Sequence, residues 1–223
     1  MKQISSAVIA LLLATTMFAQ MPDKFVNAMQ SKLALMDSAR DVNALNDLAA
    51  AFERIADAEK TQWLPYYYAA VCHVNAGNMQ MTSNGNIDMG NNSDKTDPAA
   101  NKAEELLNKA EALTKENSEI FIVKKMIATL RLMGDPMNRY MTYGAEGAQA
   151  LETAKKLNPE NPRIYLLEGL DKFYTPEQFG GSKEDAKKLF EEALKKYESF
   201  KPESNIHPNW GKNIIDTLML QMK

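Results

Sequence analysis

Apolar residues recur every three or four positions along almost the whole chain after residue 21, and no stretch alternates convincingly between apolar and polar residues. This spacing is typical of helices that bury one face. The sequence therefore predicts an all-α protein. Helices are expected at 22–36, 41–59, 65–77, 98–114, 117–134 and 135–157, after Asn161-Pro162, from Ser182 to about 197, and at the C-terminus.

Residues 79–97 interrupt this pattern, because Asn, Asp, Ser and Gly dominate the segment and favour turns. We expect a long polar loop inserted there. Its spaced acceptors suggest calcium, but the segment lacks the glycine and the closing glutamate of an EF-hand loop. A solvated loop is the favoured interpretation, and the acceptors concerned are Asn84, Asn86, Asp88 and Asp94.

Three of the expected helices share a small, large, small pattern at spacings of four and three residues, which lets a second helix approach closely. The triplets are Ala103, Leu107 and Ala110; Gly147, Leu151 and Ala154; and Ala186, Phe190 and Ala193. Each follows a helix that begins with a cap and an aromatic residue, in the segments QWLPY, NSEIF and NPRIY. Four residues after each aromatic stand Ala70, Lys125 and Gly169.

These features resemble the tetratricopeptide repeat, a helix-turn-helix unit of 34 residues. The resemblance covers about 62–197, and Lys125 departs from it because the family prefers a small residue at that position. It implies a stack of antiparallel helical hairpins, an α-solenoid, with a capping helix within 203–223. It also implies a concave face lined by Tyr67, Val71, Ile122, Met126, Leu166, Leu170 and Phe173.

Such an apolar face should not stay open to water. Either a helix or peptide of a partner covers it, or the chain's own C-terminal segment does so through Trp210, Ile214 and Leu218. We favour the second alternative, since the end of a helical stack needs a cap. A remaining pocket for a small apolar ligand is compatible with it.

The first twenty residues have the features of a cleavable signal peptide: Lys2, a short apolar run at 7–13 and small residues up to Ala19. We therefore expect export to the periplasm of a Gram-negative bacterium, or secretion, and a single domain over 21–223. No later segment has the apolar length of a membrane span. The single cysteine, Cys72, cannot form an internal disulfide and is expected in the core.

Candidate chemistry is sparse. A formal net charge of −3 with interspersed signs argues against a nucleic-acid partner. Two histidines, His73 and His207, and one cysteine are too few for a zinc site, so neither metal nor cofactor is expected. Gly181 and Ser182 open a helix and are a possible anion site. Helical spacing favours a core role for Met126, Met133, Met137 and Met141 over an adaptable binding surface.

The sequence thus predicts a non-catalytic interaction scaffold of the cell envelope that binds another protein or peptide, with its oligomeric state open. The alternative is a periplasmic binding protein for a small solute or lipid-like ligand that assists a transporter, similar to periplasmic repeat proteins that accompany some transporters. An enzyme is the third choice, because no base and nucleophile come together in the sequence.

Overall fold

The structure, a computed structural model, describes residues 22–222 apart from 84–85 and 88–89. The expected signal peptide at 1–20 lies outside the described residues. The chain is all-α, as the hydrophobic periodicity predicts. The elements in order are α1 (Asp23–Met36), α2 (Val42–Glu59), α3 (Trp63–Gln80), β1 (Thr82–Ser83), β2 (Asn86–Ile87), α4 (Ser93–Leu113), α5 (Ser118–Gly134), α6 (Pro136–Arg139), the π-helical η1 (Tyr140–Gly144), α7 (Ala145–Leu157), α8 (Pro162–Tyr174), the 3₁₀ turn η2 (Glu177–Phe179), α9 (Lys183–Ser199) and α10 (Lys212–Gln221).

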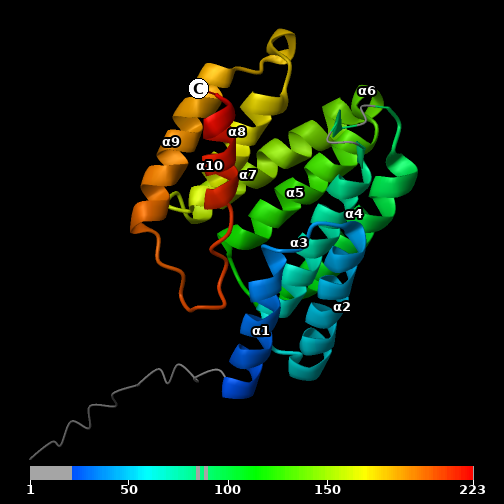
Figure 1. The fold of residues 1–223 in the computed structure, drawn as a ribbon, viewed down its shortest axis with the longest axis vertical. Helices are drawn as coiled ribbons and strands as arrows, with labels where there is room; N and C mark the ends of the chain where they lie inside the picture. Colours follow the sequence, from blue (N-terminus) through cyan, green and yellow to red (C-terminus); the bar gives the residue numbers. More distant parts are fainter. Residues whose placement is uncertain (1–21, 84–85, 88–89, 223) are drawn as a thin grey trace, which may run out of the picture.

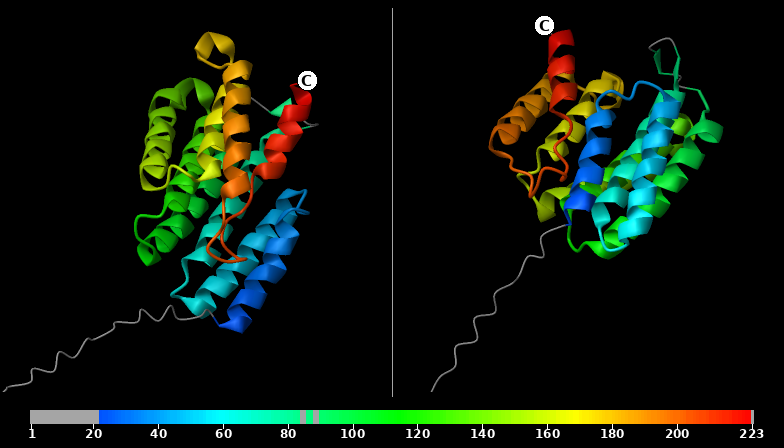
Figure 2. Two further views of the ribbon diagram at one scale, coloured as in Figure 1. Left: turned by 90° about the vertical axis from the view of Figure 1, so that its left-hand side faces the viewer. Right: turned by 60° about the horizontal axis from the view of Figure 1, so that its bottom comes forward.

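Consecutive helices pack beside one another as a stack of antiparallel hairpins (Figures 1 and 2). The helices α1 to α5 form the larger group, and α7 lies against α5. The helices α8, α9 and α10 form a second group on the other side of α7. Of the described residues, no helix is both long and apolar enough to cross a membrane.

Each group has its own core. The largest apolar cluster runs through α1 to α5 and includes Phe25, Phe52 and Leu107. A second cluster joins α8, α9 and α10. A third, with Ile122 on α5 and Ile164 on α8, connects the two groups. The region between the groups therefore holds residues from both halves of the stack.

Side-chain caps fix several helix starts as the sequence predicts. Asn117 Oδ1 accepts a hydrogen bond from the Glu119 amide at 2.9 Å, and Asn161 Oδ1 accepts one from the Arg163 amide at 3.1 Å. Ser182 Oγ accepts from the Asp185 amide at 3.1 Å. These bonds satisfy amide groups that have no partner within the first turn of a helix.

The small, large, small triplets are buried where helices meet. A methyl group at Gly169 would lie 2.4 Å from Phe190 Cε1, so α8 and α9 pack this closely only with glycine there. Gly147 lies against the Lys125 side chain, because a methyl group added at Gly147 would be 3.0 Å from Lys125 Cδ. Lys125 Nζ donates to Asp171 Oδ1 at 2.8 Å, which explains how a lysine replaces a small residue at this position.

The loop predicted at 79–97 is shorter than expected, which corrects its bounds. The helix α3 continues to Gln80, and α4 begins at Ser93 and includes Pro98. Asn91 Oδ1 accepts a hydrogen bond from the Ser93 amide at 3.1 Å, so the helix starts before the proline. The connection contains the β1 and β2 pair. Among the suggested calcium acceptors, Asn84 and Asp88 lie outside the described residues.

The C-terminal helix, expected within 203–223 and to include Trp210, runs from Lys212 to Gln221. Residues 200–211, called the C-terminal strap below, cross the molecule without regular structure, and Trp210 belongs to this strap. Ile215 and Leu218 of α10 are buried in the second apolar cluster. The chain's own end thus packs on α8 and α9.

Candidate functional site

The seven residues predicted to line a concave face are all buried or partly buried in this structure. Tyr67, Ile122 and Leu166 have 0% exposure, and Val71 has 2%. The remaining three residues are partly buried, and they are Met126, Leu170 and Phe173.

The C-terminal segment covers this face. Leu166 shares a cluster with Ile215 and Leu218 of α10, and Trp210 of the strap packs against the same cluster. The chain's own C-terminal segment therefore occupies the place where a partner's helix or peptide would otherwise bind.

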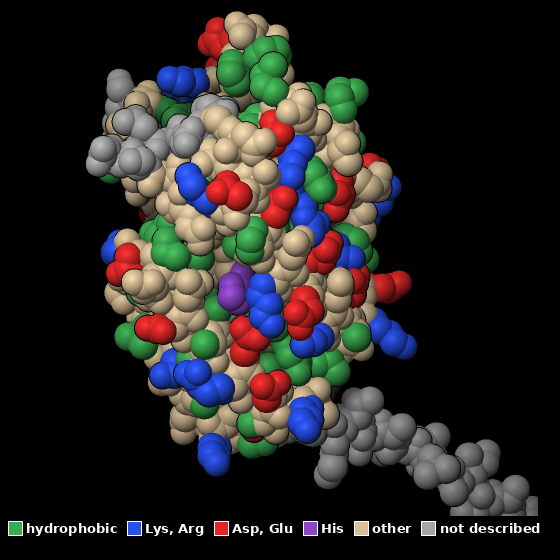
Figure 3. Space-filling view, turned by 90° about the vertical axis from the view of Figure 1, so that its right-hand side faces the viewer, with side chains coloured by type: hydrophobic (Ala, Val, Ile, Leu, Met, Phe, Trp, Pro, Cys, Tyr) green, Lys and Arg blue, Asp and Glu red, His purple; other side chains and the backbone are tan. Residues whose placement is uncertain are grey.

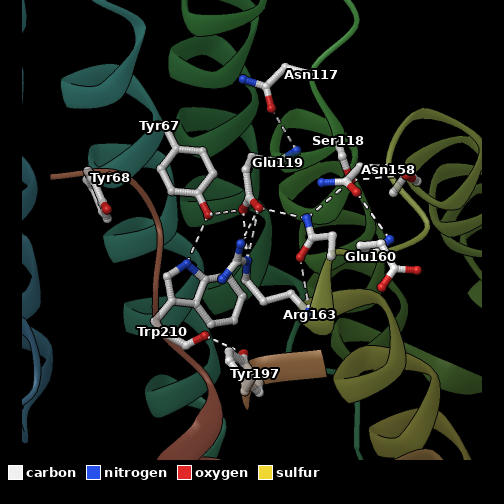
Figure 4. A network of polar contacts seen from close by, with 12 residues as sticks. Tyr67, Tyr68, Asn117, Ser118, Glu119, Asn158, Glu160, Arg163, Tyr197 and Trp210 are labelled. Atoms are coloured by element: carbon white, nitrogen blue, oxygen red, sulfur yellow. Dashed lines mark hydrogen bonds and ion pairs between the residues drawn. The ribbon is translucent and has the colours of Figure 1, made fainter. Parts of the chain in front are cut away.

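A polar network lies beneath this cover, between the two groups of helices (Figure 4). The Arg163 guanidinium is fully buried and donates from Nε to both oxygens of Glu119 at 3.0 Å and from Nη2 to Oε1 at 2.5 Å. Asn161 Nδ2 donates to Glu119 Oε1 at 2.7 Å and to Ser118 Oγ at 3.1 Å. This pairing joins the first turn of α5 to the first turn of α8.

The same network holds the C-terminal strap. The Tyr67 hydroxyl donates to Glu119 Oε2 at 3.0 Å and accepts from Trp210 Nε1 at 2.9 Å. The Tyr197 hydroxyl donates to the Trp210 carbonyl at 2.6 Å, and the Tyr68 hydroxyl donates to the Ile206 carbonyl at 3.0 Å. Two helices, α3 and α9, thus hold the strap through hydrogen bonds (Figure 4).

Burial determines the protonation of these groups. It raises the pKa of Tyr67 well above its usual value and that of Tyr197 to about 12, so both hydroxyls stay neutral donors. Burial opposes the charge on Arg163, but the adjacent Glu119 carboxylate outweighs it and raises the pKa of the guanidinium. The centre is therefore an ion pair with neutral hydroxyl partners, and Arg163 Nη1 is buried there without a hydrogen-bond partner.

Neither histidine has the surroundings of a catalytic group. His73 Nε2 faces Glu53 Oε1 at 3.4 Å, and His207 Nδ1 lies 2.8 Å from Ser204 Oγ. Burial lowers the pKa of both rings. Burial also raises the pKa of the Cys72 thiol to about 12, which suits the predicted core role. Within the described part of the chain, no group of three or more His, Cys, Asp or Glu residues could hold a metal ion.

The suggested anion site at Gly181 and Ser182 is occupied by the chain's own hydrogen bonds. The Ser182 amide donates to the Lys172 carbonyl at 2.9 Å, and the Gly181 amide donates to the Pro176 carbonyl at 3.2 Å. Glu184 and Asp185 place negative charge in the first turn of α9. These contacts favour a structural turn over anion binding, because both amides have partners and the nearby carboxylates repel anions.

Among the depressions on the described part of the chain, two are of interest for a ligand. One, of about 400 Å³, lies between the α4–α5 connection and the C-terminal strap and contains Trp63, Arg163 and His207. The other, of about 390 Å³, is a crevice between α1 and α2, lined by Lys32, Leu35, Ser38, Ala39, Ala44, Asp47, Leu48, Ala51 and Arg54. Figure 3 shows another face of the molecule, over which acidic and basic side chains are interspersed.

The methionines of the α5 to η1 region divide into two kinds, which corrects part of the prediction. Met126 and Met133 pack partly buried against the large core. Met137 is 91% exposed and Met141 82% exposed, so these two lie on the surface. They follow α5, where Pro136 starts the short α6 before the π-helical turn.

Comparison with solved structures finds a similar protein of the same fold. The chain is 33% identical to the HusA haemophore from Porphyromonas gingivalis, with a TM-score of 0.75, over 89% of this chain and 92% of that chain. No protein-family model matches the sequence, so the resemblance to tetratricopeptide repeats stays a prediction. No curated protein sequence matches it either.

Proposed function

The chain belongs to the family of the HusA haemophore, and from this premise we propose that it is a secreted protein that binds haem or a related tetrapyrrole. The single observation that carries the proposal is 33% identity with a TM-score of 0.75 over nearly the full length of both chains. A shared fold alone would not support a shared ligand. Here the two proteins also share 33% of their amino-acid sequence. The proposed role is binding without catalysis.

Several features of the described residues support this proposal. The ionisable groups at the centre of the stack neutralise one another, as the Glu119–Arg163 pair does. The crevice between α1 and α2 is concave and combines apolar side chains with a few charged ones, which suits a small-molecule site. A haemophore works outside the cytoplasm, which agrees with the signal peptide and the export expected from residues 1–20.

A protein-binding scaffold is the weaker alternative. The face that would receive the partner is covered by α10 and the C-terminal strap, with Leu166 completely buried. A partner would have to displace this segment or bind another surface. The small-ligand alternative needs neither, so we prefer it. The periplasm or the exterior of a Gram-negative cell is the proposed location.

Native mass spectrometry tests the function in its natural setting. The protein should be recovered from the medium or the envelope fraction of its producing bacterium after growth with hemin. We expect a species whose mass exceeds that of the mature chain by one haem. Recovery without a tetrapyrrole but with a stoichiometric protein partner would instead support the scaffold.

A further inference from the structure

We propose that the crevice between α1 and α2 receives the macrocycle of the bound tetrapyrrole, and that Lys32 and Arg54 pair with its carboxylates. This inference rests on the proposed function. The crevice measures about 390 Å³, and its lining comes from the two helices and from their connection at residues 38 and 39.

The floor of the crevice is apolar and consists of two alanines and one leucine. Leu48 is 6% exposed, Ala51 7% and Ala39 9%, so their methyl groups form a low surface between the two helices. Leu35 stands at the edge and is 49% exposed, although it is large and apolar. A flat apolar ligand laid on this floor would remove Leu35 from water, which is favourable.

The charges at the crevice suit an anionic ligand. Among the described residues, neither the Lys32 nor the Arg54 side chain has an ion-pair or hydrogen-bond partner. Of the lining residues on α1, Lys32 is the farthest from the α1–α2 connection, and of those on α2, Arg54 is the farthest. Asp47 is the acidic residue of the lining, seven residues before Arg54 and therefore roughly 10 Å nearer the connection.

This arrangement matches the chemistry of haem. The macrocycle is planar and apolar, and its two propionates lie side by side on one edge. With the macrocycle over the apolar floor, that edge would point away from the connection, where the two cations are. The length of α2 from Ala44 to Arg54 is about 15 Å, which is enough for such a ligand.

Hemin titrations of surface variants test the assignment. We expect Leu35→Glu to weaken hemin binding roughly tenfold or more, because it places a charge against the macrocycle. Lys32→Ala/Arg54→Ala should weaken binding about two- to fivefold for each cation removed. Hemin dimethyl ester, which lacks the carboxylates, should bind the wild type and this double variant equally.

Matched controls are available elsewhere on the surface. Lys187→Ala/Lys195→Ala removes two exposed cations from α9, and Met137→Glu places a charge on another exposed apolar residue. Both should bind hemin like the wild type. If Met137→Glu abolished binding while Leu35→Glu did not, the site would be elsewhere and the crevice assignment wrong, although the proposed function would stand. A wild type that does not bind hemin would overturn both.

A labelling experiment gives an independent readout. The native thiol of Cys72 is buried, so Leu35→Cys introduces a single reactive cysteine at the crevice. Hemin should slow the reaction of this cysteine with a maleimide. As a control, Leu220→Cys places a cysteine on α10 at a position that is 67% exposed in the native chain. This cysteine should react at the same rate with and without hemin. Equal labelling of Leu35→Cys with saturating hemin would contradict the proposal.

Discussion

Glu119 and Arg163 pair at the buried centre of the molecule, where Arg163 Nη2 lies 2.5 Å from Glu119 Oε1. The two residues hold equivalent places in the segments NSEIF and NPRIY, the first turns of α5 and α8. Their opposite charges therefore join matching positions of two successive hairpins. Because Tyr67 also bonds to Glu119 and to Trp210, this pair holds the C-terminal strap as well.

Removal of one member of the pair should strongly destabilise the fold. Glu119→Gln would leave the Arg163 guanidinium charged and buried without a counter-ion, at a cost of about 3–5 kcal/mol in the free energy of unfolding. Urea denaturation of the variant and the wild type measures this cost.

Replacement of both members distinguishes a buried charge from a simple packing defect. Glu119→Leu/Arg163→Met should recover most of the lost stability, because apolar residues of similar volume often substitute for buried ion pairs. A double variant less stable than Glu119→Gln would show that the pair itself contributes net stability.

Trp210 should control the attachment of the strap. Trp210→Phe removes the hydrogen bond from Nε1 to the Tyr67 hydroxyl and should cost about 1 kcal/mol. We expect faster cleavage after Glu203 within the strap by a glutamate-specific protease, measured by peptide mass spectrometry. In a double-mutant cycle with Tyr67→Phe, the two effects should not add; strict additivity would mean that this bond does not hold the strap.

Close packing of α8 on α9 predicts an intolerance to added volume. Gly169→Ala would place a methyl group 2.4 Å from Phe190 Cε1, so we expect a loss of roughly 1–3 kcal/mol by thermal denaturation. Phe190→Leu in the same chain should restore part of it by making room. If Gly169→Ala is as stable as the wild type, the contact between these helices is looser than described.

Stability should fall as the solution is acidified from about pH 8 to about pH 5. Burial lowers the pKa of His73 and of His207 below the unfolded value of 6.5, so the unfolded chain binds more protons over this range. His73→Gln/His207→Gln should flatten the dependence of the urea midpoint on pH. An unchanged slope in the double variant would assign the effect to other groups.

The hydrophobic periodicity predicts most of the fold. Helix faces and caps follow local rules, so α5, α8 and α9 start where Asn117, Asn161 and Ser182 indicate. The bounds of α4 could not be predicted in this way. Its start depends on contacts with the end of α5, such as the bond from the Asn92 amide to the Gly134 carbonyl at 2.6 Å.

The site is much less evident from the sequence than the fold. In the sequence, Glu119 and Arg163 look like ordinary charged residues in the first turn of a helix. The one hint that they pair is that they have opposite charges and occupy the same position in the segments NSEIF and NPRIY. The crevice between α1 and α2 depends on the space left between alanine side chains, which no residue pattern reveals. Met137 is exposed because Pro136 starts a new short helix, although its spacing matches a core face.

The most direct test of the central claim is an absorption titration of the purified mature chain with hemin. We predict a saturable shift of the Soret band that ends at one hemin per chain, with matching quenching of tryptophan fluorescence. A spectrum equal to the sum of free hemin and free protein at every ratio would contradict the assignment of this chain as a tetrapyrrole-binding protein.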